Sequence, residues 1–185
     1  MTSAELSALL VLATVSSFTP GPNTTLSTAM AANHGLRRAM RFVCAVPVGW
    51  GILFVLCATG LGGLVVAFPP LRWGIVTLGT GYLLWLASRL WQSGRLQQAD
   101  SQKLHIGFFQ GVGLQFLNIK AWMLALAIVA GWVAGRDDAS ARTLMLLPIM
   151  VAYGFVSNLT YAVAGSVLRH WLAHGRRLLV FNRCM

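Results

Sequence analysis

Lys120 is the residue with the clearest potential for chemistry, because it is the only charged residue well inside a long apolar segment. An ammonium group is costly to place within a membrane, so such a residue is by default a functional candidate. No carboxylate lies in the apolar segments to neutralise it, and we therefore expect its partner to be the carboxylate of a small substrate. In the alternative interpretation, Lys120 extends toward the membrane surface and nearby Asn118 only binds a neighbouring helix.

A helix-breaking cluster is the second feature with binding chemistry. It occupies residues 18–25, inside the apolar segment from about 4 to 33. Its two prolines and one glycine predict two half-helices with unpaired backbone groups between them, the second half capped by Asn23 or Thr24. The free N–H groups that begin the second half favour an anion. The predicted substrate-binding residues are Pro20, Gly21, Pro22, Asn23, Thr24, Asn118 and Lys120.

Other polar residues in the apolar segments have both a binding and a packing interpretation. Gln115 could face a cavity or could bind a neighbouring helix. Tyr153, Asn158 and Tyr161 could receive a substrate ammonium group through oxygen and ring contacts, or could be interfacial tyrosines and a packing amide. The sequence leaves both interpretations open.

Catalytic and metal chemistry have weaker support. Ser16 or Ser17 could pair with Lys120 as the nucleophile and base of an intramembrane enzyme, but no third group orients such a pair. His170 and His174 stand one helical turn apart, and two ligands make no metal site. We therefore expect neither an enzyme nor a bound metal or cofactor.

The elements that must position these residues are membrane-spanning helices. Hydrophobic residues make up 57% of the chain and charged residues 10%, against roughly 25% charged in soluble domains. Five apolar segments are long enough to cross a membrane core about 30 Å thick. They cover about 4–33, 42–68, 71–93, 106–134 and 143–168. We expect one transmembrane domain over residues 1–185, retained from its first helix because Glu5, and no basic residue, begins the first segment.

The charges between the segments predict orientation. The net charge of +10 comes from basic residues after the first, third and fifth segments, whereas the second and fourth connections carry little net charge. By the positive-inside rule these basic connections are cytoplasmic and the N-terminus is outside. The basic residues form no single face, so we expect no nucleic-acid partner.

An internal repeat is suggested by matching positions in the two halves. Arg41 precedes Pro47 by six residues and Arg142 precedes Pro148 by six, and each pair follows an interrupted apolar segment. Two halves of three spans must have opposite orientations, with a site where the interrupted helices meet. The predicted fold is an all-α, polytopic membrane helix bundle with an inverted 3+3 repeat and a broken first helix. A sixth helix should follow residue 177 and is largely missing from the sequence.

Several motifs resemble those of the lysine exporter (LysE/RhtB) family of bacterial amino-acid efflux proteins. They are the break at residues 20–23, the basic stretch 34–39, the segment 79–87, and Asn118 with Lys120. The stretch 115–120 is most similar to the cysteine and O-acetylserine exporter branch. The resemblance covers nearly the whole chain.

The resemblance implies a six-span secondary transporter that exports amino acids or close derivatives. It implies a location in the bacterial inner membrane and export driven by the proton gradient. The expected partners are a small zwitterionic amino acid and the lipid bilayer. Separately from the resemblance, the small-residue faces left by the missing helix favour self-association. The shortened sixth span leaves a truncated, non-transporting membrane protein as the alternative.

Overall fold

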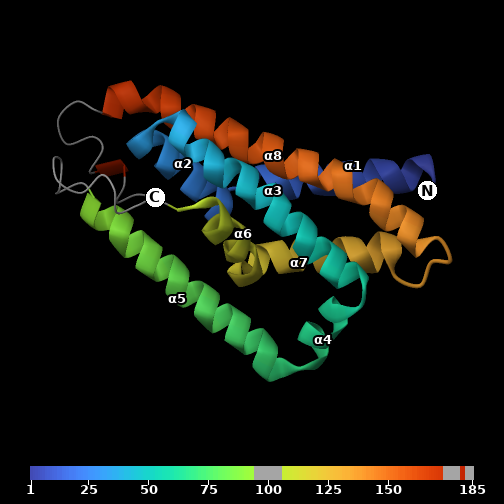
Figure 1. The fold of residues 1–185 in the computed structure, drawn as a ribbon. Coiled ribbons are helices and arrows are strands. Elements are labelled where there is room, and N and C mark those ends of the chain that lie inside the picture. The colour runs from blue at the N-terminus through green and yellow to red at the C-terminus, as the bar shows by residue number, and fades with distance from the viewer. Residues whose placement is uncertain (94–105, 173–179, 182–185) are drawn as a thin grey trace.

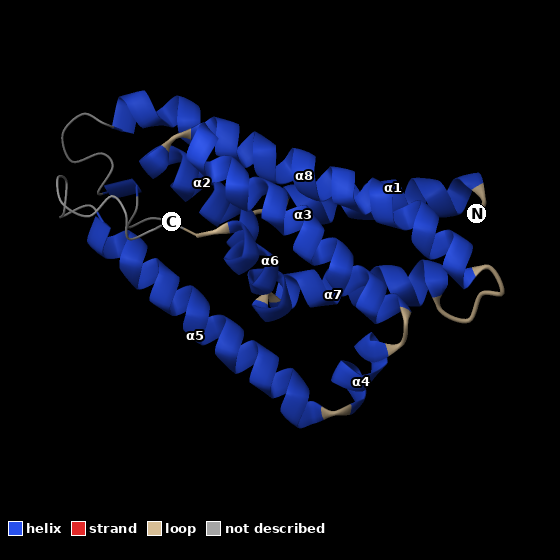
Figure 2. Cartoon of the chain, viewed as in Figure 1, coloured by secondary structure: helices blue, strands red, loops and turns tan. Residues whose placement is uncertain are grey.

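The computed structural model describes residues 1–93, 106–172 and 180–181. Among these residues every regular element is helical and no strand occurs (Figure 2). The elements are α1 (Ser3–Phe18), α2 (Pro22–His34), α3 (Leu36–Ala58), α4 (Leu61–Ala67), α5 (Pro69–Ser93), α6 (Phe108–Leu117), α7 (Ile119–Ile128), the π-helix η1 (Val129–Val133) and α8 (Ala139–Leu172). The predicted all-α class is confirmed for the described residues. The predicted sixth helix falls largely outside them.

Membrane-spanning length is reached by single helices and by bent pairs. Helices α3 and α8 are each long and apolar enough to span a membrane. Three pairs reach that length together, and they bend by 47° at α1–α2, 95° at α4–α5 and 69° at α6–α7. The described residues therefore contain up to five spans, as expected for a polytopic bundle, and the first span is broken as predicted.

The second predicted segment, 42–68, is divided between two helices. Helix α3 begins earlier, at Leu36, and ends at Ala58. The chain then turns at Gly60, which has a φ of 98°. This left-handed conformation is available to glycine at little cost and is typical of helix ends. Apolar composition alone could not locate this turn, because the residues on both sides of it are hydrophobic.

The two broken pairs run in opposite directions through the bundle (Figure 1). Near the start of α1, the Glu5 carbonyl accepts a hydrogen bond from Trp132 Nε1 in η1, at 2.9 Å. Near the start of α2, the Asn23 side chain binds Gln115 in α6. The pair α1–α2 therefore runs antiparallel to the pair α6–α7. This antiparallel arrangement is what an inverted repeat requires, and it places the two breaks beside each other.

The centre of the bundle is formed by α2, α3, α6 and α8, while α5 lies along one side (Figure 1). Close helix approach depends on glycine. A methyl group added at Gly165 of α8 would lie 2.3 Å from the Thr28 carbonyl oxygen of α2, and one added at Gly49 of α3 would lie 2.6 Å from the Val112 carbonyl oxygen of α6. Small residues at such contacts allow the backbones of membrane helices to pack directly.

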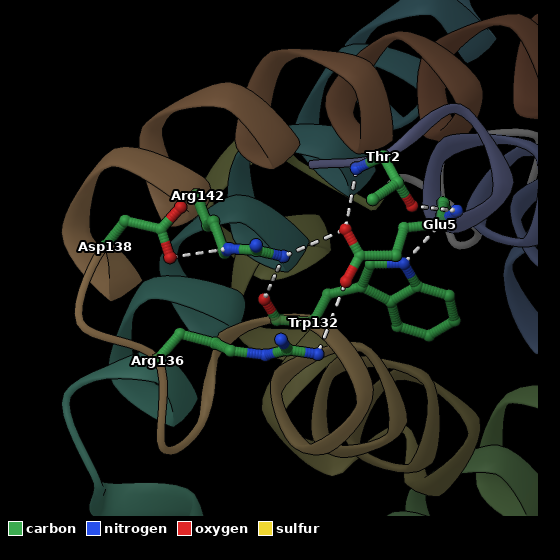
Figure 3. Close-up of polar contacts among 6 residues, drawn as sticks. All are labelled: Thr2, Glu5, Trp132, Arg136, Asp138 and Arg142. Atoms are coloured by element: carbon green, nitrogen blue, oxygen red, sulfur yellow. Dashed lines mark hydrogen bonds and ion pairs between the residues drawn. The ribbon is translucent and has the colours of Figure 1, made fainter.

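A charged network joins the first turn of α1 to the start of α8 (Figure 3). Glu5 lies 3.3 Å from the Arg136 guanidinium and 3.5 Å from that of Arg142. Arg142 also donates to Asp138 at 2.7 Å, and this bond holds the pKa of the Asp138 carboxyl below its ordinary value. The expectation that no carboxylate lies in an apolar segment overlooked Glu5. That carboxylate is committed to these two arginines.

Candidate functional site

The first break is organised around Gly21 and Pro22. Helix α2 begins at Pro22, which suits a first helical position because no N–H is needed there. Gly21 is the N-cap residue, and its N–H donates to the Thr24 hydroxyl at 2.9 Å. The prediction that Asn23 or Thr24 caps the helix is therefore wrong, and Thr24 lies at the third helical position, where its hydroxyl accepts from the N-cap residue. The reason is that the helix begins at Pro22, two residues earlier than an Asn23 cap would require.

The start of α2 retains free hydrogen-bond donors. Among the described residues, no acceptor is found for the backbone N–H of Asn23 or of Thr24. The first N–H groups of any helix lack partners within the helix, and they carry the positive end of its dipole. The break therefore presents two donors suited to an anion, in agreement with the chemistry expected from the sequence.

The end of α1 presents three carbonyl groups that side chains of other helices satisfy. The Ser157 hydroxyl donates to the Ser17 carbonyl, and the Tyr161 hydroxyl donates to the Phe18 carbonyl at 2.8 Å. The Lys120 ammonium donates to the Thr19 carbonyl at 2.6 Å. These bonds supply donors to carbonyl groups that have no partner within the helix, as is usual at a helix end. They also hold the first break against α7 and α8.

The second break separates α6 from α7 at Asn118. Asn118 is the N-cap of α7, and its side-chain oxygen accepts from the Lys120 N–H at 3.1 Å. From this first turn of α7 the Lys120 side chain reaches the first break, where its ammonium donates to the Thr19 carbonyl. A methyl group added at Gly21 would lie 3.1 Å from Lys120 Nζ, so the glycine leaves space for the ammonium beside the backbone.

A reciprocal amide pair ties the two breaks together. Asn23 Nδ2 donates to Gln115 Oε1 at 2.8 Å, and Gln115 Nε2 donates to Asn23 Oδ1 at 3.2 Å. Gln115 also donates to the Gly111 carbonyl and is fully buried. Of its two interpretations, the structure supports helix-to-helix binding. The Asn23 side chain is likewise engaged, which leaves its backbone N–H and one N–H of its side-chain amide for a ligand.

A cavity of about 70 Å³ lies where the two breaks meet, enough for several water molecules or part of a small solute. Six of the seven predicted binding residues line it, and Pro20 does not, because it lies exposed at the break. The six are Gly21, Pro22, Asn23, Thr24, Asn118 and Lys120. The structure therefore brings together two stretches of chain that the sequence analysis could only propose to join.

The remaining cavity wall comes largely from residues that the sequence analysis missed. Helix α3 contributes Pro47 and Trp50, and α8 contributes Gly154 and Ser157. In the sequence Pro47 stands out only as a marker of the repeat. A proline inside an apolar segment locally disturbs helix hydrogen bonding, and this signal could have directed attention to its neighbours on the same helix face, including Trp50.

The candidate ammonium-binding residues instead hold helices together. Tyr153 receives a hydrogen bond from Thr14 at 3.2 Å, and Tyr161 is bound to the α1 carbonyl described above. Asn158 accepts from Ser27 at 2.9 Å and donates to the Gly154 carbonyl. Of the three, only Asn158 lines the cavity, and both ends of its amide are already engaged. The packing interpretation is therefore supported for all three.

The proposed serine–lysine pair is not formed. Ser16 and Ser17 both line the cavity with Lys120. The Lys120 ammonium, however, donates to the Thr19 carbonyl, and among the described residues neither serine hydroxyl has a hydrogen bond to it. A general base must be within hydrogen-bond reach of its nucleophile. The possible metal pair at His170 and His174 involves side chains outside those that the structure describes.

Comparison with known proteins gives the family. The family described as LysE type translocator matches residues 14–185. A cysteine/O-acetylserine efflux protein of Klebsiella pneumoniae subsp. pneumoniae is 30% identical over 181 residues, which cover 96% of this chain and 91% of the relative. Proteins of the same name from Salmonella choleraesuis and Escherichia coli O1:K1 are 28% and 27% identical, with the same coverage. No solved structure matches the chain significantly. The chain belongs to the LysE type translocator family.

Proposed function

We propose that this protein exports a small zwitterionic amino acid, of the cysteine or O-acetylserine kind, across the bacterial inner membrane. The family and the names of the relatives support export and this substrate class. The observation that carries the proposal is the meeting of both helix breaks at one cavity with Lys120. Broken helices that meet in an inverted repeat are the arrangement by which many secondary transporters bind their substrates.

In this proposal the substrate carboxylate binds between Lys120 and the start of α2. An ammonium group has three N–H donors, of which one is given to the Thr19 carbonyl. The N–H groups of Asn23 and Thr24 add two uncharged donors and the positive end of the helix dipole. Asn118 lies beside them with its side-chain NH₂ still free of any partner in the described part of the chain. The donors compensate the carboxylate for its lost hydration.

The orientation in the proposal follows the distribution of basic residues. A methyl group added at Gly35 would lie 2.6 Å from the Arg169 guanidinium, so the α2–α3 corner and the C-terminal part of α8 share one end of the bundle. Arg37, Arg38 and Arg41 follow that corner. Glu5 and Asp138 mark the opposite end. The arginine-rich end is cytoplasmic under the positive-inside rule, and the N-terminus is outside.

Energy coupling completes the proposal. Export against a gradient needs a driving ion, and the proton gradient is the source that we propose. Lys120 is the ionisable side chain among those described that line the cavity. A collapse of export on addition of a protonophore, with the sodium gradient maintained, is the expected result. Export that persists without a proton gradient and requires sodium would refute this part of the proposal.

The test of the site uses Lys120→Gln in cells that lack their own cysteine and O-acetylserine exporters. We expect efflux of both compounds to fall at least tenfold, because glutamine keeps a polar N–H donor on a slightly shorter side chain but removes the charge that binds the carboxylate. Arg72→Gln is the matched control, because Arg72 is exposed and does not line the cavity. Normal efflux by a Lys120→Gln protein that is inserted at wild-type levels would refute the site.

A further inference from the structure

Trp50 carries a hydrogen-bond donor that the structure leaves unused. This residue of α3 is only 7% exposed, and its ring stacks on Phe54 with a centroid separation of 5.3 Å. The indole Nε1 is buried and, among the residues that the structure describes, has no hydrogen-bond partner. Trp50 also lines the cavity between the two helix breaks. A buried donor without an acceptor costs free energy, and such groups are rare enough to need an explanation.

Two other tryptophans, one buried and one half-buried, have indole groups that are bonded inside the protein. Trp122, which is 8% exposed, donates to the Phe116 carbonyl at 2.9 Å. Trp132 donates to the Glu5 carbonyl at 2.9 Å. Tryptophan N–H groups usually find a partner when buried. Of the indole groups of Trp50, Trp122 and Trp132, only that of Trp50, which lines the cavity, is therefore without a partner among the described residues.

The other polar groups of the α3 and α8 wall are already committed. The Asn158 amide binds Ser27 and the Gly154 carbonyl, and the Ser157 hydroxyl donates to the α1 end. The donors near Lys120 belong to the carboxylate in the proposed function. Among the described residues of this wall, Trp50 is thus the side chain whose buried polar atom has no partner at all, and what it lacks is an acceptor.

We propose that Trp50 Nε1 donates a hydrogen bond to an acceptor oxygen in the side chain of the substrate, so that the site selects O-acylated amino acids. The inference rests on the proposed function and extends it to selectivity. An ester carbonyl is a good acceptor, whereas a thiol sulfur is a weak one. A site built to hydrogen-bond a group discriminates strongly against analogues that lack it, because its own buried partner is then left unpaired.

The test compares O-acetylserine with O-ethylserine, which has a similar length but lacks the carbonyl oxygen. Efflux of both is measured with the wild-type protein, with Trp50→Phe and with Trp122→Phe. Phenylalanine keeps an aromatic ring against Phe54 and removes only the N–H donor and part of the ring. Trp122→Phe is the matched control, because it removes an N–H that is already bonded inside the protein.

We expect the wild-type protein to prefer O-acetylserine by roughly tenfold, the effect of one hydrogen bond with a buried donor. Trp50→Phe should bring the ratio close to one, and Trp122→Phe should leave it unchanged. Equal efflux of the two compounds by the wild-type protein, or an unchanged ratio in Trp50→Phe, would overturn the inference alone. Efflux of neither compound by the wild-type protein would instead count against the proposed function.

If Trp50→Phe does not insert into the membrane, the affinities of the purified wild-type protein for the two compounds decide the matter. A tighter affinity for O-acetylserine, together with protection of tryptophan fluorescence from an aqueous quencher by this compound and not by O-ethylserine, supports a bond to a cavity tryptophan. Equal affinities overturn it.

Discussion

The amide pair between Asn23 and Gln115 offers the sharpest test of how the two breaks are joined. We expect Asn23→Leu to lower the free energy of unfolding by about 1–3 kcal/mol, because Gln115 Oε1 is then buried without a partner. Gln115 is fully buried, so water cannot replace the lost bond. Gln115→Leu should cost less, because Asn23 is only partly buried and lines the cavity, where water can reach it.

The double variant should be more stable than the sum of the two single changes predicts. Replacing both partners by apolar groups removes the bonds without leaving a buried group unpaired. Hydrogen bonds between membrane helices have measured coupling energies of about 0.6 kcal/mol on average and about 1.7 kcal/mol at most. Two such bonds join this pair, at 2.8 and 3.2 Å. The expected coupling energy is therefore about 1–3 kcal/mol.

The assay is reversible unfolding of the purified protein in mixed micelles with increasing sodium dodecyl sulfate, followed by far-ultraviolet circular dichroism. The control is a second cycle of Gln115→Leu with Thr160→Ala. Thr160 is exposed and donates within its own helix to the Val156 carbonyl, so these two changes should add within about 0.5 kcal/mol. Strict additivity of the Asn23 and Gln115 changes would refute the idea that this pair joins the breaks.

Two further predictions concern the packing and the charged network. Gly165→Ala should lower the free energy of unfolding by about 1–3 kcal/mol relative to Gly154→Ala, because its methyl group would lie 2.3 Å from a backbone oxygen and that of Gly154→Ala 3.7 Å from a proline side chain. Both variants gain the same helix propensity, so equal stability in the unfolding assay would contradict the contact. Arg142→Met should lower the melting temperature more than Arg136→Met, because the Arg142 side chain is 11% exposed and that of Arg136 46%. Arg136→Met should lower the free energy of unfolding by no more than about 1 kcal/mol, as for other exposed ion pairs. A larger fall in melting temperature for Arg136→Met than for Arg142→Met would show that Arg142 does not hold the network.

The sequence alone was enough to place the first helix break and to select Lys120. Both conclusions depend on local rules. Proline lacks a donor wherever it stands in a helix, and glycine accepts conformations that other residues avoid. A lysine within an apolar segment is costly regardless of which helix lies beside it. The class of fold also followed from composition, because only helices and closed barrels satisfy the backbone within lipid.

Only the tertiary structure decided how those stretches form a site. The Asn23–Gln115 pair joins residues 92 positions apart, and no periodicity in the sequence indicates such a pairing. The commitment of Glu5 to two arginines and the unpaired state of Trp50 depend equally on which helices meet. Apolar residues that face lipid and those that face a neighbouring helix have the same hydrophobicity in a membrane protein, so the pattern does not reveal the contacts. The contacts between helices depend on packing and hydrogen-bond geometry, and these are defined only once the helices have assembled.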